Sequence, residues 1–145
     1  MSTEENKALV RRIPEEVYNQ GKLDVADEVI DPEYIEHAQL PPDIPPGIPG
    51  LKQFVTALRT AFPDFRYTVE DEIAEGDKVV IRLTASGTQQ GDFLNIPASG
   101  KQASWSEIHI CRMADGKLVE HWVTIDQMGM MQQLGVLPAP GQATP

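Results

Sequence analysis

The stretch that decides the fold lies near the end of the chain, at Lys117–Gly135, with the sequence KLVEHWVTIDQMGMMQQLG. Its first half alternates β-branched and aromatic side chains, which predicts a β-strand: Val119, Trp122, Val123, Thr124 and Ile125. Its second half places Met128, Met131 and Leu134 close to helical spacing, and Gly135 follows as a stop signal. The stretch therefore predicts a strand that passes directly into a short helix.

Asp126 stands where this strand becomes the helix. Strand alternation puts Asp126 on the same face as Trp122 and Thr124, and it puts His121 on the opposite face. If the Asp126 face lines a pocket, desolvation raises the pKa of the carboxyl group and makes it an acid or base near neutral pH. The alternative is that Asp126 caps the helix by accepting a backbone N–H, and the residue type alone favours this cap. We expect His121 at the outer surface or in an interface.

Charge and composition exclude several classes of protein. The 145 residues carry 12 basic and 22 acidic side chains, a net charge of −10, and no basic cluster. We therefore expect no nucleic-acid and no membrane partner. The N-terminus has no apolar signal core and no stretch is long enough to span a membrane, so we expect a cytoplasmic protein. The single cysteine, Cys111, is expected to be buried and structural.

We expect one domain over residues 1–137 and a loose Pro- and Gly-rich tail over residues 138–145. Helical spacing predicts a helix over residues 3–20, which Pro14 kinks or divides so that a second helix begins with Pro14 in its first turn. Ser2 and Glu5 fit a capping box at its start. A further short helix is predicted over residues 23–30 and the clearest one over residues 50–62.

Four strands are predicted in the second half of the chain, over residues 65–74, 78–88, 101–113 and from 117 onward, joined mostly by tight turns. On the third of these strands, Trp105, Glu107 and His109 share one face with Cys111. Helices followed by hairpins and a closing helix indicate an α+β fold. We expect helices packed on one face of a curved antiparallel sheet, an arrangement that naturally leaves a cavity.

Five segments together resemble the SnoaL-like polyketide cyclases, a branch of the nuclear-transport-factor-2-like fold. They occur in one order between about residue 5 and residue 137, without a large insertion: ENKALVRR, NQGKLDVADEVIDPEYIEH, GLKQFVTALRTAFPDF, EDEIAEGDKVVIRLTASGTQQGDFLNIPASGK and DGKLVEHWVTIDQMGMMQQLG. The resemblance implies a cone, that is, a strongly bent antiparallel sheet wrapped around a pocket that the N-terminal helices close. It also implies a homodimer formed through the outer face of the sheet.

In family members with cyclase chemistry, an aspartate after the E-x-W strand is the general acid/base, and the position that resembles it here is Asp126. The residue type alone favoured a helix cap, whereas the resemblance favours a pocket aspartate at Asp126. The two roles are compatible, because one carboxylate can both cap a helix and face a pocket. The implied reaction is an intramolecular aldol closure of a small, apolar, carbonyl-rich molecule. It requires no metal and no cofactor, since the carbonyls of the substrate stabilise the carbanion, while the pocket confines the chain and raises the pKa of the base.

His109 and His37 are the expected supporting groups of Asp126. The predicted pocket wall consists of Trp105, Glu107, Trp122, Gln89, Phe93, Leu83 and Tyr34. Zinc is not expected, because the spacing of His37, His109 and His121 matches no ligand motif.

Some residues depart from the family pattern, and they keep other functions open. Gln89 stands where many relatives have histidine, and Trp105 is bulkier than usual, so the pocket is expected to be reshaped. The alternative function is a non-catalytic module of the same fold that binds a small ligand. An epoxide hydrolase ranks last, because it needs an Asp–Arg–Asp arrangement and Arg82 lies on the strand face away from Leu83.

Overall fold

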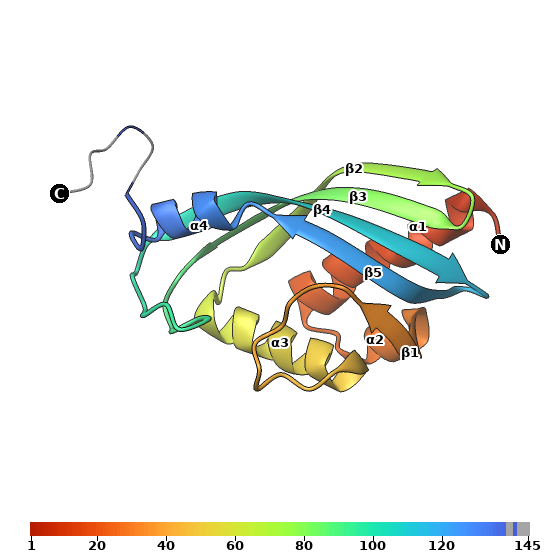
Figure 1. Ribbon diagram of the computed structural model, residues 1–145, viewed down its shortest axis with the longest axis horizontal. Coiled ribbons are helices and arrows are strands. Elements are labelled where there is room, and N and C mark those ends of the chain that lie inside the picture. The colour runs from red at the N-terminus through yellow and green to blue at the C-terminus, as the bar shows by residue number, and fades with distance from the viewer. Residues whose placement is uncertain (139–140, 142–145) are drawn as a thin grey trace.

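The computed structural model describes residues 1–138 and residue 141, so the predicted tail falls almost entirely outside the described residues. Its centre is a five-stranded sheet in the order β1-β5-β4-β3-β2 (Figure 1). The strands are β1 (Ile30–Glu36), β2 (Arg66–Glu75), β3 (Lys78–Thr88), β4 (Gln102–Ala114) and β5 (Lys117–Ile125). The predicted α+β fold class is confirmed.

Strands β2 to β5 pair antiparallel, as predicted, but β1 adds to the edge of the sheet parallel to β5. The sheet is therefore mixed rather than purely antiparallel. No hairpin turn ties β1 to a neighbouring strand, so no local signal in the sequence fixes its direction.

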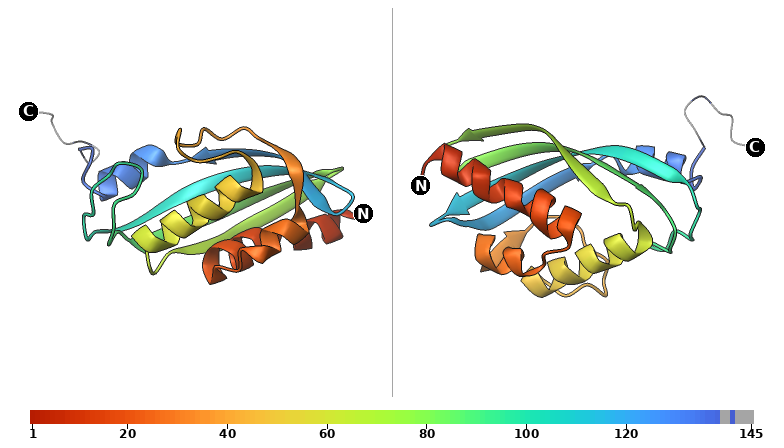
Figure 2. Two further views of the ribbon diagram at one scale, coloured as in Figure 1. Left: turned by 90° about the horizontal axis from the view of Figure 1, so that it is seen from below. Right: turned by 180° about the vertical axis from the view of Figure 1, so that it is seen from behind.

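The N-terminal helices all lie along one side of the sheet, and α4 continues beyond the end of β5 (Figure 2). The helices are α1 (Thr3–Arg12), the π-helix η1 (Ile13–Tyr18), α2 (Asp24–Val29), α3 (Gly47–Ala61) and α4 (Gln127–Gln133). The predicted capping box forms, since Ser2 Oγ accepts from the Glu5 amide at 3.0 Å and Glu5 Oε1 accepts from the Ser2 amide at 3.1 Å. Pro14 lies in the first turn of η1, as predicted, where its missing N–H is tolerated.

Helix α3 begins three residues before its predicted start, at Gly47. Pro49 does not prevent this, because it lies in the first turn, where a backbone N–H has no intrahelical partner. The buried face of α3 packs toward the sheet and supplies Val55, Leu58 and Ala61 to the core.

The inner face of the sheet is set by the register of β3, β4 and β5. Alternate residues of β3 are buried: Val79, Ile81, Leu83 and Ala85. Cys111 of β4 pairs with His121 of β5, and His109 pairs with Val123, so both β5 residues lie on the inner face. A bulge at Val119 brings Leu118 to this face as well, because an extra residue reverses the alternation. The inner face of β5 is therefore the one opposite to the face of Asp126.

In the part of the chain that the structure describes, no helix is both long and apolar enough to cross a membrane.

Candidate functional site

Two adjoining cavities lie between the inner face of the sheet and the helices that cover it. The larger has a volume of about 360 Å³ and the smaller about 70 Å³. They share seven lining residues: Tyr18, Tyr34, Glu36, Leu51, Tyr67, His109 and His121. A volume of a few hundred Å³ is in the range of sites for small organic ligands.

The walls away from this junction are mostly apolar, although Gln39, Gln127 and Glu107 also line the larger cavity. The larger cavity is lined by aromatic and aliphatic side chains, which include Phe54, Phe65, Phe93, Trp105, Val123, Ile125 and Met130, and Leu40 and Pro41 also line it. The smaller cavity lies against aliphatic residues, among them Val10, Ile13, Ile81, Leu83 and Leu118. Cys111 also lines it, and burial raises the pKa of its thiol to about 12, so the thiol stays protonated at neutral pH.

A chain of four titratable side chains crosses the junction, and we call it the polar chain: Glu107, His109, His121 and Glu36. Glu107 Oε1 lies 2.8 Å from His109 Nε2, and His109 Nδ1 lies 2.8 Å from His121 Nε2. His121 Nδ1 lies 2.6 Å from Glu36 Oε2. Strand register explains this arrangement, because His109 and Glu107 are alternate residues of β4 and His121 is the partner of Cys111.

Three other side chains and one amide support the two carboxylates of the polar chain. Glu107 is 4% exposed and accepts hydrogen bonds from the Tyr67 hydroxyl and from Trp105 Nε1, each at 2.8 Å. Glu36 accepts from the Tyr34 hydroxyl at 3.3 Å and from the Ala38 amide at 3.2 Å. Burial by itself raises the pKa of Glu36, but the hydrogen bonds from His121, Ala38 and Tyr34 outweigh it and lower the pKa below its ordinary value.

The hydroxyl groups of the cavity are held in their neutral form. Burial and the nearby carboxylates raise the pKa of Tyr18, Tyr34 and Tyr67 well above the ordinary value, so each remains a hydrogen-bond donor. Tyr34 and Tyr67 donate to Glu36 and Glu107, whereas no side-chain hydrogen bond acts on Tyr18 among the described residues. The Tyr18 hydroxyl is therefore available to a bound molecule.

Comparison with known proteins agrees with this architecture. The family model of the SnoaL-like polyketide cyclases matches residues 8–134. The chain belongs to the SnoaL-like polyketide cyclase family. It is 36% identical over 131 residues to the aklanonic acid methyl ester cyclase DnrD of Streptomyces peucetius, and the match covers 88% of each chain. It is 31% identical over 119 residues to the nogalonic acid methyl ester cyclase of Streptomyces nogalater, covering 81% of this chain and 89% of that one.

The solved structure of TsrD from Streptomyces laurentii superimposes with a TM-score of 0.86 at 33% identity, covering 94% of this chain and 99% of that chain. The SnoaL-like fold expected from the resemblance is thus confirmed by both sequence and structure.

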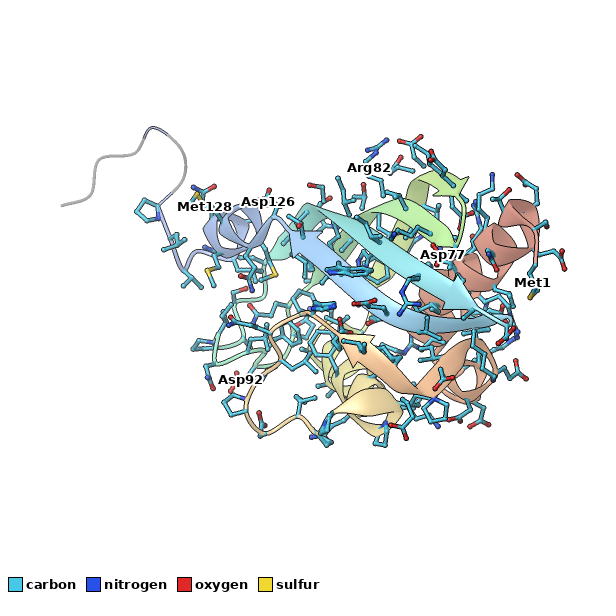
Figure 3. All side chains as sticks on the ribbon, turned by 45° about the vertical axis from the view of Figure 1, so that its right-hand side comes forward. Met1, Asp77, Arg82, Asp92, Asp126 and Met128 are labelled. Atoms are coloured by element: carbon cyan, nitrogen blue, oxygen red, sulfur yellow. The ribbon has the colours of Figure 1, made fainter. Side chains whose placement is uncertain are left out.

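Within this SnoaL-like fold, Asp126 lies away from the cavities. Its carboxylate is exposed and caps α4, where Oδ1 accepts the Gly129 amide at 2.9 Å (Figure 3). The expectation that the face of Asp126 lines the pocket is wrong, because the register with β4 turns the other face of β5 inward. His109 accordingly contacts Glu107 and His121 instead of Asp126.

His37 and Trp122 also lie outside the cavities. Their rings stack at a centroid distance of 4.9 Å, and His37 Nε2 contacts Glu120 Oε2 at 2.7 Å. The His37 side chain is 42% exposed. Neither residue lines either cavity, for the same reason of strand facing.

Gln89 is fully buried but lines neither cavity. Its amide nitrogen donates to the Ile96 carbonyl at 2.9 Å and its amide oxygen accepts from the Ser99 hydroxyl at 2.8 Å. Gln89 therefore holds the loop of residues 91–100, whose Phe93 lines the larger cavity.

The remaining predicted wall residues do line the cavities: Trp105, Glu107, Phe93, Leu83 and Tyr34. The prediction missed Glu36, Tyr18, Tyr67 and His121. Alternation already gave Glu36 the face of Tyr34, and it placed His121 in an apolar stripe with Val123 and Ile125, which is the pattern of an inner face.

Arg82 lies on the exposed side of the sheet (Figure 3) and forms an ion pair with Asp71 at 2.6 Å. It is thus remote from the cavities and offers no Asp–Arg–Asp site. Within the described residues, no group of three or more His, Cys, Asp or Glu side chains is arranged to hold a metal ion.

Proposed function

We propose that this protein is a cyclase that closes a ring in a small, uncharged, carbonyl-rich molecule by an intramolecular aldol reaction. The observation that carries the proposal is the polar chain at the junction of two largely apolar cavities in a SnoaL-like fold. The relatives are named as cyclases of aklanonic and nogalonic acid methyl esters, so we take polyketide esters of this kind as the substrate class.

In this proposal Glu36 is the base. Its Oε2 accepts two hydrogen bonds, from His121 and Ala38, whereas its Oε1 accepts only the long bond from Tyr34. Oε1 therefore keeps a lone pair for a proton from a carbon that lies between two carbonyl groups. A carboxylate suffices for such a carbon because both carbonyls delocalise the carbanion. The carboxylate that His109 and His121 support is then that of Glu36 and not that of Asp126.

In this proposal the Tyr18 hydroxyl binds the substrate carbonyl that the carbanion attacks. As the carbanion attacks, the carbonyl oxygen becomes an alkoxide, and the free Tyr18 hydroxyl can stabilise it by a hydrogen bond. The alkoxide finally takes a proton from the polar chain, so one proton moves from carbon to oxygen and none is consumed. The apolar walls confine the flexible substrate near its closing geometry.

The test is ring closure of aklanonic acid methyl ester by three purified variants. Glu36→Gln and His121→Gln should lower kcat by about 100-fold or more, as is typical for loss of general acid–base catalysis. Asp126→Asn, which keeps a side-chain oxygen for the α4 cap, should leave kcat roughly unchanged. Loss of activity in Asp126→Asn with full activity in Glu36→Gln would refute this assignment and return the base to Asp126.

The second candidate function is a non-catalytic module that binds a small ligand in the same cavities. One observation favours it: every ring nitrogen of His109 and His121 is already engaged within the polar chain, so neither ring has a free nitrogen for a substrate. Tight binding of the ester without any turnover in the wild-type protein would support this function and exclude the cyclase with this substrate.

A further inference from the structure

The polar chain contains three hydrogen bonds in series, and each needs one proton. Glu107 meets His109, His109 meets His121, and His121 meets Glu36, at 2.8, 2.8 and 2.6 Å. These distances are those of hydrogen bonds, so no contact in the series brings two lone pairs together.

Two neutral imidazoles cannot supply this number of protons. A neutral imidazole carries one N–H, and an ionised carboxylate only accepts. If His109 donates to Glu107 and His121 donates to Glu36, the remaining nitrogens, His109 Nδ1 and His121 Nε2, face each other at 2.8 Å as two acceptors. A third proton must therefore lie in the series.

The net negative charge of the site also favours a third proton. Glu36 and Glu107 are the only carboxylates that line the cavities, and among the described lining residues there is no lysine and no arginine. Side chains of His109 and His121 are only 15% and 16% exposed, and that of Glu107 4%. Two uncompensated carboxylates in such a place are unfavourable, and one additional proton lowers the net charge of the four groups from −2 to −1.

We propose that Glu36, His121, His109 and Glu107 form a proton relay that holds three protons at neutral pH, one of them shared between the two histidines. The inference deepens the proposed cyclase function by identifying how the site stores and moves the proton of the reaction. It rests on that function only for its kinetic consequence, since the proton count is a property of the free protein.

The relay connects the two carboxyl groups without any net uptake of protons. At rest both carboxylates are ionised and the two imidazoles carry the three protons. When Glu36 Oε1 takes the proton of the substrate carbon as a fourth, the shared proton passes to His109 Nδ1 and His109 Nε2 gives its proton to Glu107, so Glu107 becomes a carboxylic acid and both imidazoles end neutral. A proton removed from the substrate carbon at Glu36 thus becomes available at Glu107, which also lines the larger cavity and is hydrogen-bonded to Tyr67. The base and the acid of the aldol step can then lie at different points of the cavity wall.

The test is a nitrogen NMR spectrum of the histidine rings in the full-length protein, because it distinguishes protonated from unprotonated ring nitrogens. The chain has three histidines, and His37 serves as an exposed internal reference. At neutral pH we expect three of the four ring nitrogens of His109 and His121 to be protonated. Two protonated nitrogens, which means two neutral rings, or four, which means two cations, would each overturn the proposal.

A matched pair of variants gives a second measurement. In Glu107→Gln the amide group can donate to His109 Nε2, so three hydrogen bonds need only two imidazole protons, and the count should fall from three to two. Glu120→Gln alters a carboxylate that contacts His37 and Arg112 instead, so its count should stay at three. A count that stays at three in Glu107→Gln would show that the shared proton does not depend on the carboxylate and would refute the relay.

The kinetic consequence separates this inference from the proposed function. In a relay, His109→Gln and the double variant His109→Gln/His121→Gln should lower kcat to the same level, because one break interrupts the whole series. Additive losses would contradict the relay and leave the cyclase intact. If the wild type shows no turnover, the cyclase proposal fails, whereas the NMR count still decides whether the three protons are present.

Discussion

At the scale of single residues, the same residue types occur in quite different environments. Asp126 and Glu36 are both carboxylates at the end of a strand, yet one caps a helix in solvent and the other lies at the junction of two cavities. His37 stacks on the outer face while His109 and His121 meet inside. What distinguishes each pair is the side of the sheet, which strand register decides.

The ionisation of Glu36 should contribute to stability in a defined range of pH. Its folded-state pKa lies below the ordinary value near 4.5, so the ionised form stabilises the folded state above that value. This contribution is lost as the pH falls through the lowered pKa. We expect Glu36→Gln to lose less unfolding free energy than the wild type between about pH 5 and pH 3.

Urea denaturation at a series of pH values checks this expectation. Glu33→Gln is the matched control, because Glu33 lies on the same strand with an exposed side chain and should keep the pH dependence of the wild type. Parallel curves for the wild type and Glu36→Gln would show that the carboxylate of Glu36 contributes nothing in this range.

At the scale of elements, the loop before α3 packs closely against the helix at Gly50. A Cβ at Gly50 would lie 1.7 Å from the carbonyl oxygen of Pro45, a distance that no packing can accommodate. The loop also carries Leu40 and Pro41, which line the larger cavity. Close contact between loop and helix therefore shapes the cavity rim.

Gly50→Ala should move the loop away from α3 and lower the unfolding free energy by about 1–3 kcal/mol or more. Gly91→Ala is the control, because its Cβ would lie 3.4 Å from the nearest atom, the Cα of Ala61. Thermal unfolding and the backbone amide shifts of Leu40, Asp43 and Ile44 measure the two effects. Equal stability of the two variants would show that the loop adapts without loss.

At the scale of the whole molecule, charge should select an uncharged substrate. The chain has a net charge of −10, and the described residues that line the cavities include two carboxylates but no lysine or arginine. A carboxylate on the ligand would be repelled, whereas a methyl ester would not. We expect aklanonic acid methyl ester to bind at least about 10-fold more tightly than aklanonic acid, a difference of about 1.4 kcal/mol.

Calorimetric titration of the wild type with the ester and with the free acid measures this preference. In Glu36→Gln the preference should become smaller, because one repelling carboxylate is removed. Equal affinities in the wild type would contradict the assignment of an uncharged substrate class.

The outer face of the sheet supports a second proposal at this scale, the homodimer. An apolar row crosses four strands in register, from Ile73 through Val80 and Ile110 to Trp122, and Ile108 beside it is 46% exposed. Contiguous apolar surface of this kind is typical of an interface. We propose that a second copy of the chain covers it.

Light scattering after size-exclusion chromatography tests the dimer. The wild type should have twice the mass of the 16.0 kDa chain, and Ile108→Lys should shift it to the monomer. Gln53→Lys, which makes the same change of charge on the exposed surface of α3, should remain dimeric. A monomeric wild type would exclude this proposal.

The sequence by itself determined the elements and the family. Periods of two and of about 3.6, together with local signals such as the Ser2–Glu5 capping box and Pro14, are local properties, and they predicted the helices and strands within a few residues. The alternation along β4 also put Glu107 and His109 on one face with Trp105, as the structure has them.

Only the tertiary structure decided which face of β5 lines the cavities and which strand neighbours it. Alternation separates two faces without saying which one is inside, and a short edge strand carries no signal of its partner or direction. Pairing with β4 turned His121 inward and Asp126 outward, and the parallel addition of β1 brought Glu36 to His121 from 85 residues away. The candidate site is thus a product of long-range pairing, because its four titratable groups come from three strands.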